Sequence, residues 1–351
     1  MKKTALYLLL LLFAFRASAQ DRTAIDSIRK LIPEHPGPKN TKELYNLANE
    51  YSSFGLSPDS IQPILDQILE IADKHEHTPS YVRAYFLKGV LAFRAQDLRE
   101  SLGYFLSAYT ILDTSYYTDW QVSIPNALGV VYATMEQNDL ASQHYLKAIS
   151  VAEKNGHEVG LPQAYSNLAI LLGNLNENQQ AISSLRKAMV LNLKQNSEVR
   201  FITNLYSLTS LFVNEHQYDS AVFYAHKVLE SSQKADYEMG IIRGHKALAN
   251  AYTMNEEYDK AIAHSQWVLN SNDQSPERPI NHLMAFRVLA LAYAKTGQRA
   301  ASLRAIDSTL MLLDSINFPM YVPASYEQLS QACAALGDYQ QALDYYERFH
   351  R

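Results

Sequence analysis

The sequence predicts an all-α fold built from about eight stacked helix hairpins. The first supporting observation is a period: small residues in apolar helical stretches recur every 40 or 41 positions. The second is a matching small residue twelve positions after each of these. The third is composition, because Gly and Pro number only 12 each in 351 residues while Tyr numbers 24. Few helix-breaking residues, together with repeats too short to bury a core alone, indicate helical units that stack on one another.

The chain begins with the pattern of a secretion signal. Lys2 and Lys3 precede an eleven-residue apolar run over positions 5–15, and the small residues of positions 17–19 follow. Eleven helical residues cover about 17 Å, less than the roughly 30 Å of a bilayer core, which disfavours the alternative of an uncleaved membrane anchor. We therefore expect cleavage after Ala19 and an exported, soluble, periplasmic or secreted product. No cysteine follows the run, so the pattern is not that of a lipoprotein anchor.

The charge and cysteine content exclude several classes of protein. The net charge is −5, and removal of residues 1–19 would leave 28 basic against 36 acidic residues, a net charge of −8. An acidic chain is a poor general nucleic-acid binder, so we expect no nucleic-acid partner. Cys333 is the only cysteine, which excludes a disulfide scaffold, and its place in a helix-packing pattern predicts a buried structural thiol.

Residues 20–40 precede the repeats. The amphipathic stretch 25–32 is closed by Pro33, and a Pro-Gly-Pro turn follows at positions 36–38. We expect an N-terminal pre-helix or linker here rather than a domain, and a repeat array over residues 41–351.

The repeat register is set by two small residues in each unit. The first set comprises Ala48, Gly89, Gly129, Ala169, Thr209, Ala249, Ala290 and Ser330. The second set comprises Ser60, Ser101, Ala141, Ala181, Ala221, Ala261, Ser302 and Ala342. Two helices of 14 to 18 residues approach closely only where small residues face each other, and larger side chains three or four positions away fill the flanks. Helix starts are expected at Pro79, Pro162, Pro279 and Pro323, because Pro is tolerated in the first helical turn.

With these residues in register, the sequence resembles the tetratricopeptide repeat family. The third repeat carries the pattern most fully, with Leu128, Gly129, Tyr132, Ala141 and Tyr145. The 40-residue period resembles the longer-helix subclass found in bacterial regulators, and the paired small residues favour it over HEAT or armadillo arrays of similar period. The resemblance implies a right-handed α-solenoid of eight helix hairpins. It also extends to the exported sensory region of histidine kinases and LuxR-like regulators of the Bacteroidetes type, whose output domains do not follow here.

No motif in the sequence indicates catalysis. A phosphate-binding Gly loop, a Gly-x-Ser-x-Gly turn, a His-Glu-x-x-His zinc motif and a Cys-x-x-Cys pair are all absent from the 351 residues. We therefore expect no enzyme activity, no catalytic residue, no metal and no cofactor.

The family resemblance implies that the first helix of each repeat lines an inner groove. Eight residues at the implied groove positions are charged, and seven of them are basic. They are Lys42, Arg83, Arg94, Arg243, Lys246, Arg287, Lys295 and the acidic Glu327. Arg243, Lys246 and Asn250 share one face of a helix, and Arg287 is their counterpart in the next repeat. They predict a clamp for a carboxylate of a peptide terminus or an acidic side chain; the alternative is a solvated helix face.

Asparagines form a second group of candidate ligand residues. Asn126, Asn174 and Asn214 are expected on inner helices, with Asn167 beside them. Their amides can pair with an extended peptide or with neighbouring repeats, and the sequence does not decide between these alternatives.

These features predict a non-catalytic protein that binds a protein or peptide, possibly an acidic one. The alternative is the sensory region of a truncated signalling regulator, which would reach a membrane only through a missing C-terminal continuation. The last repeat lacks a polar cap. Its apolar and aromatic side chains are expected to be exposed and to allow self-association; they are Tyr339, Leu343, Tyr345, Tyr346 and Phe349.

Overall fold

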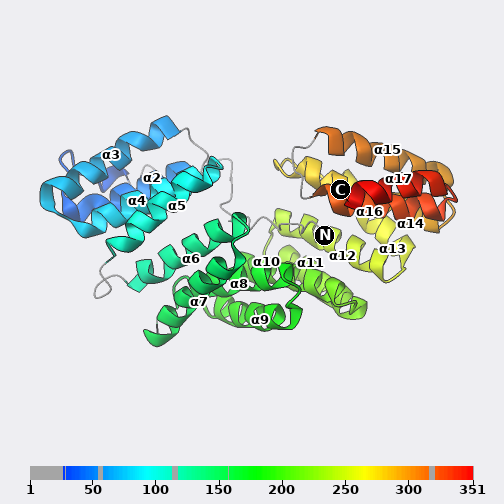
Figure 1. Cartoon of the computed structure of the whole chain (residues 1–351), viewed down its shortest axis with the longest axis horizontal. Helices are drawn as coiled ribbons and strands as arrows, with labels where there is room; N and C mark the ends of the chain where they lie inside the picture. Colours follow the sequence, from blue (N-terminus) through cyan, green and yellow to red (C-terminus); the bar gives the residue numbers. More distant parts are fainter. Residues whose placement is uncertain are drawn as a thin grey trace. The chain divides into compact units, whose positions relative to one another are not determined.

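A computed structural model describes residues 27, 29–53, 58–112, 118–156, 158–315 and 321–350. Within these ranges the chain holds sixteen α-helices and one 3-10 turn, and no strand (Figure 1). The helices fall into two compact units, an N-terminal unit that ends at Leu171 and a C-terminal unit that begins at Leu172. The all-α fold of tetratricopeptide-type helix hairpins is thereby confirmed. The expected secretion signal lies outside the described residues.

The helices follow one another in eight successive pairs. After the turn η1 (Pro38–Asn40), the first four pairs are α2 (Thr41–Ser53) and α3 (Pro58–His75), α4 (Thr78–Arg94) and α5 (Leu98–Thr110), α6 (Thr118–Thr134) and α7 (Asn138–Lys154), and α8 (Leu161–Asn174) and α9 (Asn178–Lys194). The last four are α10 (Glu198–Asn214) and α11 (Tyr218–Lys234), α12 (Glu238–Met254) and α13 (Tyr258–Asn270), α14 (Arg278–Lys295) and α15 (Arg299–Ser315), and α16 (Val322–Ala335) and α17 (Tyr339–His350).

Helix starts and stops follow simple backbone rules. Each of the four expected prolines stands at the second residue of its helix, in α4, α8, α14 and α16. The turns between paired helices repeat one geometry, in which the residue after the C-cap has positive φ and the following N–H bonds five residues back, as Gln137 N–H does to the Tyr132 carbonyl at 2.9 Å. Among the turns that the structure describes, from the α4–α5 turn onward, the positive-φ residue is Gly at Gly297 and Gly337 and a larger residue at the others, such as Glu136 or His216.

The paired small residues lie at the helix crossings, as the spacing predicts. The Ser101 hydroxyl donates to the Gly89 carbonyl at 2.8 Å and the Ser302 hydroxyl donates to the Ala290 carbonyl at 2.7 Å, each twelve residues apart. Gly129 faces the ring of Tyr145 so closely that a Cβ on it would lie 2.5 Å from the ring. Small residues in the first helix therefore make room for large buried ones in the second.

Stacked rings add a second link between paired helices. Tyr132 stacks on His144 with ring centres 5.3 Å apart, and Phe212 stacks on Tyr224 at 5.0 Å. Tyr252 stacks on His264 at 5.7 Å. Each pair is again separated by twelve residues, so the crossing that brings small residues together also aligns rings beside it.

In the C-terminal unit the first helix of each pair contacts the first helix of the next. α10 packs on α12, α12 on α14 and α14 on α16, which places these four helices in one layer. The core of this unit runs from Ala225 to Tyr345 and includes Cys333, which is 3% exposed. Burial raises the pKa of the Cys333 thiol to about 11, so the prediction of a structural thiol holds.

The helix α13 is shorter than most of its equivalents. Like α5, it has 13 residues where α7, α9 and α11 have 17, and its last turn is replaced by an irregular segment over residues 271–277. The sequence after Asn270 contains Ser271, Asn272 and Asp273, which are poor helix formers, and Pro276. This segment lies beside the first helices of the unit and contributes to the site described below.

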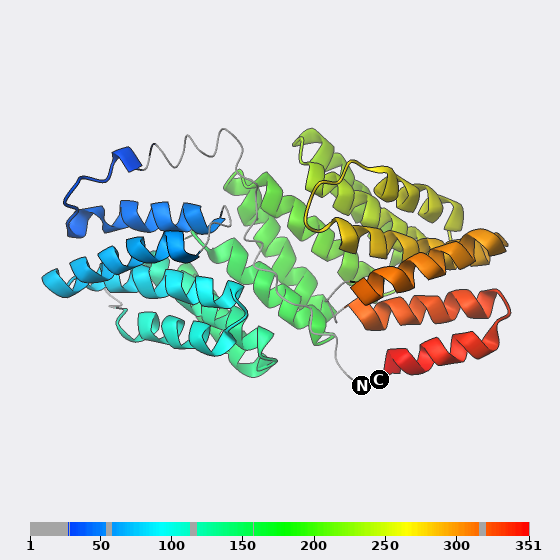
Figure 2. The ribbon, with the colours of Figure 1, turned by 90° about the horizontal axis from the view of Figure 1, so that it is seen from above.

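The side chains of the last helix pair, whose ribbon ends in red in Figure 2, correct part of the sequence interpretation. Tyr339, Leu343 and Tyr346 are exposed as expected, at 74%, 52% and 51%. Tyr345, however, is 2% exposed, because it faces α16 and packs against Tyr326 with ring centres 5.8 Å apart. Phe349 is half-buried. The expectation that all of these side chains are exposed is therefore wrong for Tyr345, and self-association through this face stays a prediction.

None of the described helices is long and apolar enough to cross a membrane.

Candidate ligand-binding site

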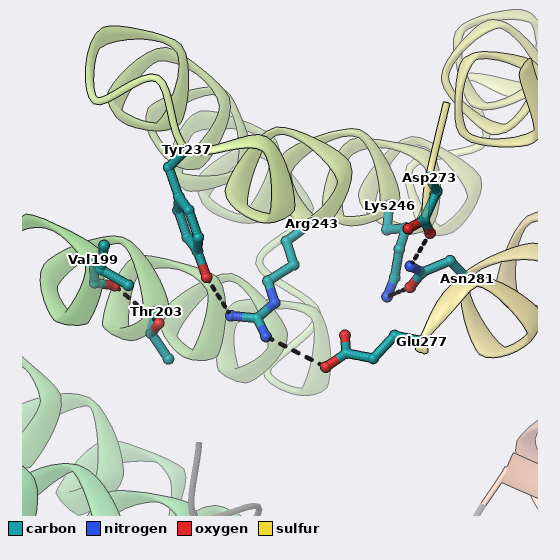
Figure 3. Close-up of polar contacts among 8 residues, drawn as sticks. All are labelled: Val199, Thr203, Tyr237, Arg243, Lys246, Asp273, Glu277 and Asn281. Atoms are coloured by element: carbon teal, nitrogen blue, oxygen red, sulfur yellow. Dashed lines mark hydrogen bonds and ion pairs between the residues drawn. The ribbon is translucent and has the colours of Figure 1, made fainter. Parts of the chain in front are cut away.

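Three basic side chains gather on the layer of first helices of the C-terminal unit, and Figure 3 shows two of them, Arg243 and Lys246. Arg243 and Lys246 lie three residues apart on one face of α12, and Arg287 comes from α14, which packs on α12. Arg243 and Arg287 both act electrostatically on Lys246, and each lowers the pKa of its ammonium group. The sequence-predicted clamp residues are thus brought together, and we call these three side chains the basic cluster.

Arg243 is held from two sides. It is 9% exposed, its Nη1 lies 3.5 Å from the Tyr237 hydroxyl, and its Nη2 lies 3.9 Å from the Glu277 carboxylate. Figure 3 shows the guanidinium group between these two partners. Because 3.9 Å is long for a charge-assisted hydrogen bond, the pair with Glu277 is a loose one.

Lys246 takes part in a chain of hydrogen bonds that begins in segment 271–277. Its Nζ donates to the Asn281 side-chain carbonyl at 2.6 Å, and the Asn281 amide donates to Asp273 at 2.7 Å. The backbone N–H of Ser275 donates to the other Asp273 oxygen at 2.8 Å. Asp273 and Asn281 are 2% and 1% exposed. Burial favours the protonated carboxyl of Asp273, but the hydrogen bonds from Ser275 and Asn281 outweigh it and lower its pKa.

Arg287 lies among tyrosines. Its charge interacts with the hydroxyls of Tyr206 and Tyr321, and its buried Nε has no hydrogen-bond partner among the described residues. Burial lowers the pKa of Arg287 and raises that of Tyr206. A buried guanidinium N–H without an acceptor costs free energy that a bound acceptor would recover.

A small pocket opens beside the basic cluster. Its accessible space is about 10 Å³, enough for roughly one water molecule. Lys246, Asn250 and Arg287 supply its polar lining, and the other lining residues are Ala249, Ser265, Val268, Met284, Ala285 and Val288. Asn250 therefore lies beside the cluster, as the sequence predicts. The arrangement suits an anionic group next to a short apolar one.

The predicted asparagines separate into two kinds. Asn167 is 4% exposed, and its side-chain amide donates to the side-chain oxygen Oδ1 of Asn126 at 3.0 Å, while the Gln163 side chain donates to Oδ1 of Asn167 at 2.9 Å. This is a bond between the first helices of neighbouring repeats, one of the two alternatives that the sequence left open. Asn174 and Asn214 are the last residues of α8 and α10, half-buried and exposed respectively, so they do not extend this chain.

The other predicted groove residues do not form a second cluster. Arg83 donates to the Thr41 hydroxyl at 3.1 Å, and Arg94 donates to the carbonyl and hydroxyl of Ser52, so both tie α4 to α2. Lys42, Lys295 and Glu327 are exposed.

Sequence reasoning missed the polar partners of the basic cluster. Tyr206, Tyr237 and Tyr321 line it, and Glu277, Asp273 and Asn281 hold it. The density of polar residues after Asn270 was the available signal for the last three, but Asp273 and Glu277 lie in an irregular segment that follows no helical period, and Asn281 in α14 bonds to that segment.

Comparison with known proteins identifies the repeats. The tetratricopeptide repeat model matches residues 126–155, 162–194 and 323–349. These segments of the chain are tetratricopeptide repeats. These matches cover the third and fourth helix pairs of the chain and its last pair, in the register set by the small residues. No curated protein sequence matches the chain significantly.

Solved structures similar to this chain support the same fold. The apo form of RapI has a TM-score of 0.67 and 13% identity, with 94% of each chain covered. The apo quorum sensor NprR from B. thuringiensis has a TM-score of 0.58 and 14% identity, over 88% of this chain and 96% of that one. The Rap conjugation gene regulator of plasmid pLS20, in complex with the Phr* peptide, has a TM-score of 0.51 and 12% identity, over 96% and 98%. At these identities the likeness shows the fold.

Proposed function

We propose that this protein binds an acidic peptide or protein segment through the basic cluster of its C-terminal unit and catalyses no reaction. The observation that carries the proposal is a shortage of close counter-charges. Three partly or fully buried cations converge; Glu277 lies at ion-pair distance from Arg243, whereas Asp273 and Glu327 act on Lys246 and Arg287 without an ion pair. Desolvated cations that lack a close counter-charge favour an anionic ligand.

The fold offers independent support. A structurally similar Rap regulator was solved with the Phr* peptide. Repeat arrays bind on extended concave surfaces, and the family resemblance implies that the layer of first helices lines that surface. In this chain that layer carries Arg243, Lys246 and Arg287 together with half-buried tyrosines. Tyrosine is common where proteins bind peptides, because it offers a large apolar ring and a hydroxyl.

The strength of the interaction follows from its chemistry. A hydrogen bond to a charged group contributes about 1.5–3 kcal/mol when water is excluded. Two such bonds from the basic cluster to one carboxylate would distinguish an acidic peptide from its amide counterpart by about a hundredfold or more in Kd. The attraction is weakened by salt, because part of the cluster is open to solvent.

The proposal is tested with a panel of fluorescent decapeptides rich in Asp and Glu, each matched to a copy with Asn and Gln. Fluorescence anisotropy at low and high salt should show binding of acidic peptides that weakens as salt rises. The double variants Lys246→Glu/Arg287→Glu and Lys246→Gln/Arg287→Gln should lose this binding. Circular dichroism establishes that each variant is folded.

A matched control reverses two exposed cations of the same unit, Lys234 on α11 and Arg304 on α15. The variant Lys234→Glu/Arg304→Glu makes the same change in net charge and should bind as the wild type does. Equal loss in both charge-reversed variants would show that only net charge matters, and unchanged binding in the cluster variants would refute the site.

Export is a separate part of the proposal. It rests on the basic start, apolar run and small residues of positions 1–19. Mass spectrometry of the mature protein from the source cell should show Gln20 as the first residue, and an intact Met1 in the cell interior would contradict export. The role as a sensory region of a kinase or LuxR-like regulator stays a prediction.

A further inference from the structure

The pocket beside the basic cluster is lined by hydrogen-bond donors from three helices. Its polar lining consists of Lys246 and Asn250 of α12, Ser265 of α13 and Arg287 of α14. The ammonium, guanidinium, hydroxyl and amide groups of these side chains all carry N–H or O–H donors. None of the described residues that line the pocket is Asp or Glu. A space with this lining favours an acceptor, and an anionic acceptor most strongly.

Two of these donors have no acceptor in the described parts of the chain. The Ser265 side chain is fully buried, and neither its Oγ nor the buried Nε of Arg287 has a hydrogen-bond partner there. Lys246 uses one of its three N–H donors for the Asn281 side-chain oxygen, 2.6 Å away, and two remain. Buried donors without an acceptor destabilise a folded chain, so a bound particle that accepts from them is favoured.

The carboxylates near the pocket do not supply this acceptor. Asp273 acts on Lys246 and Glu327 acts on Arg287 through space, and in the described ranges neither carboxylate lies within ion-pair distance of its cation. Glu277 also acts on Lys246, but its ion pair, at 3.9 Å, is with another member of the basic cluster. An anion in the pocket would therefore meet two cations that no carboxylate neutralises by contact.

The size of the pocket decides which anion it can hold. Its accessible space is about 10 Å³, which suits one particle of about the size of a water molecule. Phosphate, sulfate and carboxylate groups can approach the basic cluster from outside, but they have too many atoms to lie inside this space. Chloride is a single atom only slightly larger than water, and the flexible side chains of Lys246 and Met284 in the lining can adjust to the difference.

The remaining choice is between a water molecule and a monatomic anion. A water molecule has to place its own two hydrogens, for which the polar lining offers the oxygens of Ser265 and Asn250. A chloride ion needs donors alone, and the charges of Lys246 and Arg287 attract it while they leave a neutral water molecule less strongly held.

We propose that this pocket is a halide site that binds one chloride ion. The Ser265 hydroxyl and Nε of Arg287 donate to the ion, together with a remaining N–H of Lys246 and the Asn250 amide. Because these groups come from α12, α13 and α14, the bound ion links three helices of the C-terminal unit and stabilises their packing. The site goes beyond the proposed function, since it takes its ion without any peptide.

Chlorine NMR on the full-length protein, with no peptide present, tests this binding in solution. Chloride that exchanges between bulk water and a protein site gives a broadened ³⁵Cl signal, and bromide that competes for the site removes the broadening. We expect saturable broadening in the wild type. Arg287→Gln should lose most of it, and Ser265→Ala, which keeps the charge, should lose a large part. Arg304→Gln removes an exposed charge on α15 and should broaden the signal as the wild type does.

Crystals of the wild-type protein soaked in sodium bromide give a second readout that needs no variant. Bromide scatters anomalously and water does not, so an anomalous peak is expected within hydrogen-bond distance of Ser265 Oγ and Arg287 Nε. Three results would overturn the inference. They are a water molecule without an anomalous signal, equal broadening in the wild type and in folded Arg287→Gln, and a bromide peak without saturable broadening in solution.

The failures of the two proposals can be told apart because both halide measurements are made without peptide. A protein that binds acidic peptides but no halide would overturn the halide site and leave the proposed function standing. A protein that binds halide but no acidic peptide would do the reverse.

Discussion

Gly129 offers a sharp test of the helix-crossing geometry. In Gly129→Ala the new Cβ would lie 2.5 Å from Cε1, 2.6 Å from Cδ1 and 3.1 Å from Cζ of Tyr145. The Tyr145 ring is fully buried, so it has no solvent to move into. The substitution therefore overpacks the crossing of α6 and α7.

The sign of the effect depends on two opposing terms. Replacing Gly by Ala inside a helix stabilises by about 1 kcal/mol through the backbone alone. Overpacking of a buried contact typically costs about 1–3 kcal/mol. Because real Cβ atoms do not approach rings as closely as 2.5 Å, the upper half of this range applies. The net expectation is a loss of about 1–2 kcal/mol in the free energy of unfolding.

Gly103 in α5 is the matched control. It is exposed, and a Cβ on it would meet nothing within 4 Å, so Gly103→Ala should stabilise by about 0.5–1 kcal/mol. Urea unfolding followed by circular dichroism, and by the emission of Trp120 in α6, measures both variants. The double variant Gly129→Ala/Tyr145→Leu, which copies the Ala169 and Leu185 pair of the fourth repeat, should recover part of the loss. If Gly129→Ala were as stabilising as Gly103→Ala, the crossing would not be packed as described.

Three further outcomes are expected. His245 and His264 share a hydrogen bond between Nδ1 atoms 2.9 Å apart, and burial lowers the pKa of His245 to about 4, below its unfolded value of 6.5. The stability that the neutral imidazole contributes is therefore fully present above pH 6.5, and the free energy of unfolding should fall by about 2 kcal/mol between pH 7 and pH 5. Thermal melts of His245→Gln should show a weaker dependence on pH. His216→Gly should raise the unfolding free energy by up to about 1 kcal/mol, because His216 has φ of 57°, and destabilisation would argue against the left-handed turn. Ala181→Leu should destabilise by about 1–3 kcal/mol, since Ala181 is fully buried; an unchanged melting temperature would mean that the repeat register is wrong.

Most of the fold could be predicted from the sequence because it is periodic. The small residues fix where helices cross, and the structure starts α2 at Thr41, where the repeat array was expected to begin. The prolines of α4, α8, α14 and α16 stand in the first turn for a local steric reason that needs no tertiary information.

The direction of side chains within a helix was harder to predict. Tyr345 and Tyr346 are neighbours of the same type, yet one is 2% and the other 51% exposed. In the second and third repeats the buried ring sits one position later, at Phe105 and Tyr145. A rotation of about 100° between successive helical residues separates the two outcomes, and only the packing of α17 on α16 decides between them.

The candidate site was predictable in its cations but not in their environment. The spacing of Arg243 and Lys246 places them on one helical face, and the repeat period adds Arg287. The buried network of Asp273 and Asn281 depends on a segment with no period, so its hydrogen bonds could not be read from the sequence. The same limit applies to Asn167. The sequence does not decide whether its side-chain amide pairs with a peptide or with a neighbouring repeat, and the hydrogen bond to Asn126 shows the second.

The shortened helix α13 shows how a repeat protein can gain a new polar site without disturbing its repeats. In α11 the residue equivalent to Asp273 is Gln233, an exposed side chain in the last helical turn. Because α13 ends at Asn270, its last turn is unwound. The position that faces solvent in α11 is therefore buried here, and its Asp273 side chain lies beside α14 with 2% exposure. The 40-residue spacing and the helix crossings need no change, since the unwound residues lie outside both. Differences among arrays of this kind can therefore arise by the loss of one turn from one outer helix, which alters what the neighbouring inner helices recognise while the core is preserved.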